Sequence, residues 1–161
     1  KNKNLSFMTQ AAMIAAIYVV LTYIFAPFSF GEVQVRISEA LTILPIFTPA
    51  AIPGLFAGCL IGNILGGAIL PDIVFGSIAT LIGAFFTWKL REQKPVVATF
   101  PPIISNIIIV PFVLRYGYGV TLPIPFMMLT VGIGEVISCT VLGLIVYGAL
   151  KKYKSTLFRT A

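Results

Sequence analysis

The sequence predicts an all-α integral membrane protein built from six transmembrane helices. Of its 161 residues, 58% are hydrophobic and only 10% are charged, whereas soluble domains carry about 25% charged residues. Six apolar segments follow one another along the chain, and a spanning helix needs about 20 such residues. We therefore expect one membrane domain over residues 1–161, with short cytoplasmic tails at about 1–5 and 152–161.

The six expected helices differ in their polar residues and prolines. Pro45 removes a backbone hydrogen bond inside the second segment, which should therefore be short or kinked. Pro71 and Asp72 form a tight connector before the fourth. Residues 30–38 alternate between apolar and polar, as is typical of an extended segment, and we expect them to cross a cavity mouth. The approximate bounds are 5–28, 39–49, 53–70, 73–88, 96–114 and 126–150.

Small residues recur at helical spacing in two of these segments. In lipid, such faces let helix backbones approach closely. The glycines of the third helix predict tight packing along its length. The alanines of the first serve either packing within this protein or docking of a partner subunit. The glycines are Gly54, Gly58, Gly62 and Gly66, and the alanines are Ala11, Ala12, Ala15 and Ala16.

Basic residues are divided unevenly between the two ends of the expected helices. Six crossings place both termini and the 89–94 connector on one side, which holds nine of the eleven basic residues; Arg36 and Arg115 fall opposite. Basic residues concentrate on the cytoplasmic side of membrane proteins, so we expect both termini in the cytoplasm. This distribution also disfavours a nucleic-acid-binding surface.

The sequence offers little for catalysis. It contains no histidine, which is the commonest general base. Its carboxylates are scattered over separate segments, without a catalytic motif or a phosphate-binding loop. Cys59 and Cys139 are expected to be small buried hydrophobic residues. We therefore expect no enzyme, no metal and no cofactor, and any active transport needs an ion gradient or another subunit.

Polar side chains within the expected membrane region form the candidate site. A charge at the centre of a membrane helix costs at least ~2.5 kcal/mol, so it normally faces a partner or a cavity. The acidic groups outnumber the two arginines, which favours an outward-facing pocket for a small solute. The alternative is structural pairing of Glu135 with Arg115 or Arg36, and of Asn63 with Asn106. The acidic groups are Glu32, Glu39, Asp72 and Glu135.

The run VQVRISEALTILPIFTPAAIPGLFAGCLIGNILGG, from Val33 to Gly67, resembles the QueT family of queuosine-precursor transporters. That family consists of substrate-binding S components of energy-coupling-factor (ECF) transporters. The resemblance extends over essentially the whole chain, including PDxxFGSxATLxG from Pro71 to Gly83, a PP…N fifth helix and a GE in the sixth.

The resemblance implies an S-component fold in the plasma membrane of a prokaryote, which takes up a queuosine precursor from outside. It also implies a membrane T component and two cytosolic ATPases as partners. The loop before Glu39 would then act as a lid. The small-residue face that would contact the T component is Ala11, Ala12, Ala15 and Ala16.

The implied ligands are 7-deazaguanines such as preQ1 or queuine. Their guanine-like edge offers two adjacent donors to one carboxylate, and the cationic aminomethyl group of preQ1 suits a second. Glu39 and Glu135 are the candidates, with Asp72 in reserve. Two amides are candidates for the ring carbonyl and nitrogens, and an arginine one turn from Glu39 would orient it. These three residues are Asn63, Asn106 and Arg36.

Two other functions stay open. The chain suits an S component for a different vitamin-like molecule, because related S components share their architecture while their pockets differ. It also suits a membrane scaffold protein whose polar residues pair internally. A gradient-driven solo transporter is disfavoured, because the chain is small and lacks the second half of an inverted repeat.

Overall fold

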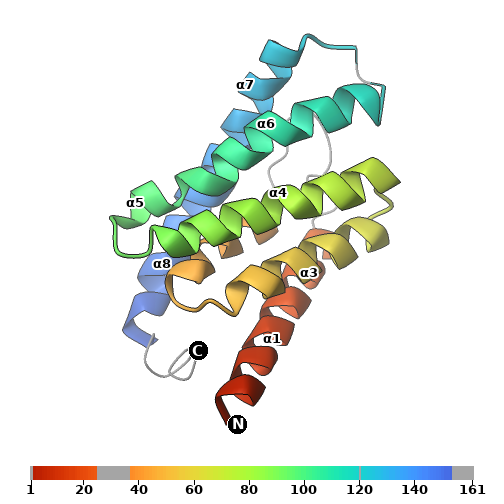
Figure 1. Ribbon diagram of the computed structural model, residues 1–161. Coiled ribbons are helices and arrows are strands. Elements are labelled where there is room, and N and C mark those ends of the chain that lie inside the picture. The colour runs from red at the N-terminus through yellow and green to blue at the C-terminus, as the bar shows by residue number, and fades with distance from the viewer. Residues whose placement is uncertain (1, 25–36, 120, 154–161) are drawn as a thin grey trace.

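The computed structural model describes residues 2–24, 37–119 and 121–153, and every regular element among them is a helix (Figure 1). Three elements are not α-helical: η1 and η3 are 3₁₀ helices and η2 is a π-helix. The elements are α1 (Asn2–Ile24), η1 (Ile37–Ile46), α3 (Ala51–Leu65), α4 (Leu70–Lys89), α5 (Pro95–Ala98), α6 (Phe100–Tyr116), α7 (Ile124–Glu135), η2 (Val136–Leu142), α8 (Gly143–Leu150) and η3 (Lys151–Tyr153).

Four stretches are long and apolar enough to cross a membrane: Leu5–Ile24, Leu70–Lys89, Pro95–Tyr116 and Ile124–Leu150. The predicted class, an all-α protein with several membrane-spanning helices, is confirmed. α3 has 15 residues and η1 has 10, which is shorter than the ~20 residues a spanning helix needs. The count of six crossings and the cytoplasmic position of both termini therefore stay predictions.

The second predicted helix differs most from an ordinary α-helix. Residues 37–46 wind as a 3₁₀ helix with Pro45 inside, so the expected short element is present with a tighter winding. Pro71 and Asp72 do not form the predicted connector, because both lie in the first turn of α4. Proline is favoured there because its fixed φ suits the first helical position. The predicted extended segment lies almost wholly outside the described residues.

The glycines of α3 permit the predicted tight packing, and the helix that they contact is α1. A Cβ added at Gly54 would lie 2.8 Å from the carbonyl oxygen of Ala11, and one at Gly58 would lie 2.7 Å from the Cβ of Tyr18. Real Cβ atoms do not approach their neighbours so closely, so only glycine permits this helix spacing.

The last spanning stretch passes behind α4 and α6 in Figure 1 and is interrupted midway by η2. Along this stretch η1 packs on η2 and α8, and it also contacts α1 and α4. The 3₁₀ helix therefore lies inside the bundle, packed against the π-helix. These two irregular segments position the candidate site.

Candidate functional site

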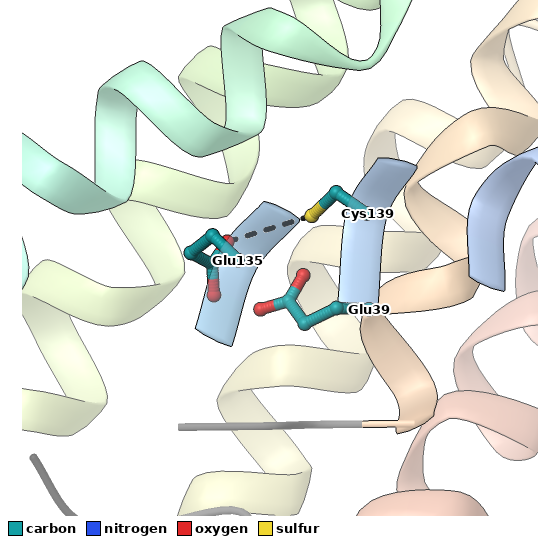
Figure 2. A group of neighbouring side chains, drawn as sticks. All are labelled: Glu39, Glu135 and Cys139. Atoms are coloured by element: carbon teal, nitrogen blue, oxygen red, sulfur yellow. Dashed lines mark hydrogen bonds between the residues drawn. The ribbon is translucent and has the colours of Figure 1, made fainter. Parts of the chain in front are cut away.

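Two glutamates meet inside the bundle. The potential ligand atoms of Glu39, Glu135 and Cys139 all lie within 4.8 Å of one another. Figure 2 shows the two carboxyl groups directed toward each other and the thiol directed at Glu135. The three side chains are 3%, 1% and 0% exposed, so a solute reaches them only after the surrounding side chains move. We call these residues, together with Asn106, the carboxylate cluster.

Each acidic residue of the carboxylate cluster lies in or next to a helix that is not α-helical. Glu39 lies in the first turn of η1, and the hydroxyl of Thr42 donates to the Glu39 carbonyl at 2.6 Å. Glu135 is the last residue of α7, and Cys139 lies one turn later in η2. π-helical segments inside α-helices, such as η2, occur frequently at functional sites. The irregular winding therefore falls on the candidate site residues.

Asn106 holds Glu135 in place from the neighbouring helix α6. Its Nδ2 donates to Oε1 of Glu135 at 2.7 Å and to the carbonyl oxygen of Pro102 at 2.9 Å. The thiol of Cys139 donates to the same Oε1 at 3.5 Å. An asparagine amide has two N–H donors, so both are used. Asn106 keeps only its Oδ1 for a ligand, instead of the donor and acceptor pair expected from the sequence.

The electrostatics of the carboxylate cluster favour positive charge and N–H donors. Two carboxylates at this separation repel each other when both are ionised, and burial strengthens the repulsion because water screens it poorly. A proton, a metal ion or an organic cation between them relieves it. Arg115 lies exposed at the end of α6, so the alternative pairing of Glu135 with Arg115 is not formed. Arg36 lies outside the described residues, and its pairing with Glu39 stays a prediction.

Asn63 and Asp72 belong to a second polar group between α3 and α4, which we call the Asp72 cluster. The hydroxyl of Tyr118 donates to Oδ2 of Asp72 at 2.7 Å, and Nδ2 of Asn63 points at the Asp72 carbonyl oxygen at 3.5 Å. Asn63 therefore does not pair with Asn106. Among the described residues, Oδ1 of Asn63 has no hydrogen-bond partner although it is buried, so it can still accept from a ligand N–H.

Sequence reasoning missed two members of these clusters. Cys139 was expected only to fill space, yet it donates to Glu135. Its spacing of four residues, one helical turn, was the available signal. Tyr118 lies 46 residues from Asp72 in a loop, and no local pattern pointed to it.

The alanine face of α1 is divided between two environments. Ala11 and Ala15 face α3, since Cβ atoms added at Gly54 and Gly58 would lie 2.8 Å and 3.2 Å from their backbones. Ala12 and Ala16 are exposed. Internal packing therefore uses half of the face, and the other half remains at the surface.

The chain resembles known transporters along most of its length. The family model described as QueT transporter matches residues 8–152. The queuosine precursor transporter QueT of Lactococcus lactis subsp. cremoris (strain MG1363) is 33% identical over 84 residues, which are 51% of this chain and 48% of that protein. The match thus spans about half the length of that relative. No solved structure matches the chain. The chain belongs to the QueT transporter family, a family of transporters and not of enzymes.

Proposed function

We propose that this protein is the substrate-binding S component of an ECF transporter, in the plasma membrane of a prokaryote. It takes up a queuosine precursor, a 7-deazaguanine such as preQ1 or queuine, from outside the cell. A membrane T component and two cytosolic ATPases supply the energy. The family assignment and the similarity to the queuosine precursor transporter QueT of Lactococcus lactis support the substrate class.

The carboxylate pair is the observation that carries this proposal. The ring N–H and exocyclic amine of a 7-deazaguanine form a pair of adjacent donors, which one carboxylate accepts through both oxygens. The ammonium group of preQ1 pairs with the second carboxylate and offsets the repulsion between the two. The potential ligand atoms of Glu39 and Glu135 lie within 4.8 Å of one another. The two carboxylates therefore separate to admit the ring, one taking its guanine-like edge and the other its ammonium group.

The amides have supporting parts in this proposal. Asn106 orients Glu135 and offers its Oδ1 to a ring N–H, while Asn63 offers its buried Oδ1 from the side of α3. Asp72 is the reserve carboxylate, because it already accepts from Tyr118 at 2.7 Å. Arg36 orients Glu39 in this scheme.

Binding of preQ1 to the purified full chain, measured by calorimetry, tests the substrate class. Guanine, which lacks the aminomethyl group, and thiamine, which lacks the purine-like ring, are the controls. We expect tight binding of preQ1 alone, unchanged by EDTA. Tight binding of thiamine would favour an S component for another vitamin. Loss of preQ1 binding in EDTA would instead indicate that a metal ion is coordinated by Glu39, Glu135 and Cys139. A folded protein that binds none of these compounds would favour the scaffold alternative.

Uptake into proteoliposomes tests the role as an S component. We expect accumulation of labelled preQ1 only when the T component, both ATPases and ATP are present. Uptake driven by an ion gradient without these partners would contradict the proposal and make the protein a solo transporter.

The exposed alanines of α1 give a sharper test of the T-component contact. A16W should abolish uptake while preQ1 affinity stays unchanged, because tryptophan keeps the partner helix away from this face. I145W is the matched control, since Ile145 is 63% exposed on α8. Equal loss of uptake in both variants would contradict the proposal that the T component docks on α1.

A further inference from the structure

A groove with a cavity volume of about 800 Å³ lies at one end of the bundle, away from the carboxylate cluster. The η1–α3 connection, the end of α4 and the start of η3 enclose it. Three basic side chains, Arg91, Lys151 and Lys152, line the groove against one acidic side chain, Glu92. We call it the basic groove. Its net positive charge favours an anionic occupant.

Aromatic rings form the walls of the basic groove and hold one of its cations. Phe47 stacks on Tyr147 with ring centroids 5.4 Å apart. The Arg91 guanidinium lies 4.4 Å from the ring centroid of Trp88, and its Nη1 donates to the Trp88 carbonyl oxygen at 2.9 Å. A guanidinium carries five N–H donors, so one contact fixes Arg91 at the rim and leaves donors for an anion.

The basic groove lies at the ends of two candidate membrane spans. The candidate spans Leu70–Lys89 and Ile124–Leu150 both end at it, and Trp88 suits the interface between apolar membrane and water. From the groove, both spans continue as exposed apolar surface, with Phe86 49% and Ile145 63% exposed. A ligand with an anionic head and apolar tails would therefore contact basic side chains with its head and exposed apolar side chains with its tails.

We propose that the basic groove binds the phosphate of an anionic phospholipid headgroup. Arg91 and the two lysines contact the phosphate, the aromatic walls contact the glycerol backbone, and the acyl chains follow the exposed faces of α4 and α8. A basic residue near an anionic membrane surface contributes about fivefold in affinity. A soluble phosphate lacks the apolar contacts, which is why the continuous apolar surface favours a lipid.

Native mass spectrometry of the detergent-purified full chain tests this assignment. The probes are phosphatidylglycerol, phosphatidylcholine with the same acyl chains, and glycerol 1-phosphate. We expect phosphatidylglycerol to be retained roughly tenfold or more over phosphatidylcholine, and glycerol 1-phosphate not to be retained. Equal retention of the two lipids would overturn the proposal. Retention of glycerol 1-phosphate would overturn the lipid assignment and make the groove a site for soluble anions.

Two variants locate the effect in the groove. The triple variant R91Q/K151Q/K152Q should lose the preference for phosphatidylglycerol, whereas E92Q should increase it severalfold. R115Q removes one charge at the exposed opposite end of α6 and should leave the preference unchanged. If R115Q reduces the preference as much as the triple variant does, the attraction comes from net charge and the assignment to the groove is wrong.

Discussion

The two polar clusters of this bundle contain similar residues, but their carboxyl groups have different neighbours. In the Asp72 cluster, one carboxylate receives a hydroxyl donor from Tyr118 at 2.7 Å. In the carboxylate cluster, two buried carboxyl groups face each other, and the donors from Asn106 and Cys139 both reach Oε1 of Glu135. A carboxylate with a neutral donor stabilises the fold, whereas two adjacent carboxylates attract a cation. The difference separates Asp72, whose role is structural in this account, from the carboxylate pair proposed to bind the ligand.

The largest expected effect is that of E135Q on ligand binding. The substitution keeps the shape of the side chain and removes its charge. We expect preQ1 affinity to fall at least about 30-fold, since truncating one member of a buried, hydrogen-bonded charge pair costs about 2–5 kcal/mol. Calorimetry measures the change. E92Q, which alters an acidic residue exposed at the end of α4, is the control and should bind normally. Unchanged preQ1 affinity in E135Q would indicate that Glu39 and Glu135 have a structural role and do not bind the ligand.

The second expected effect concerns the positioning of Glu135 by Asn106. N106A removes the donor at 2.7 Å from Oε1, so we expect preQ1 affinity to fall roughly tenfold, the order of one hydrogen bond to a charged group. S105A is the matched control, because Ser105 also hydrogen bonds across helices, to the Ala79 carbonyl oxygen at 2.7 Å. It should lose thermal stability without losing affinity. Similar affinity losses in both variants would indicate general loosening of α6.

The third variant, Y118F, addresses the Asp72 cluster. It deletes the hydroxyl that donates to Asp72, which should lower the free energy of unfolding by about 1–3 kcal/mol, the cost of leaving a buried acceptor unsatisfied. Thermal melting in detergent measures this loss, and preQ1 affinity should stay within about twofold of the native value. A large loss of preQ1 affinity with an unchanged melting temperature would indicate that Asp72 binds the ligand.

The smallest expected effect is that of G76A on the same cluster. A Cβ at Gly76 would lie 3.3 Å from both Nδ2 of Asn63 and Oδ1 of Asp72, so these side chains would shift by a few tenths of an ångström. We expect a stability loss below about 1 kcal/mol. G148A is the control, because its added Cβ meets no atom of another described element within 4 Å, and it should be neutral or stabilising. Greater destabilisation by G148A would contradict this packing.

Composition and spacing predicted the helical membrane class and the close packing of the α3 glycines, because both depend on local patterns. Local patterns could not show that Glu39 lies in a 3₁₀ helix or that a π-helix follows Glu135. Hydropathy does not distinguish these windings from an α-helix.

The grouping of the polar residues was only partly predictable. Glu39, Glu135 and Asn106 were chosen as candidates, and the structure brings them together. Asn63 and Asp72 were placed in the same candidate site but lie in a separate cluster, because the helices that carry them pack at another point of the bundle. That grouping depends on contacts between residues far apart in the sequence, such as Asp72 and Tyr118.

The most direct test compares preQ1 with preQ0, in which a neutral nitrile replaces the cationic aminomethyl group on the same ring. Both affinities are measured for the native protein, E39Q and D72N. We expect the native protein and D72N to prefer preQ1 strongly, and E39Q to lose most of that preference. Equal affinity of the native protein for the two ligands, or a preference that D72N loses and E39Q keeps, would contradict the assignment of the carboxylate pair to the ligand.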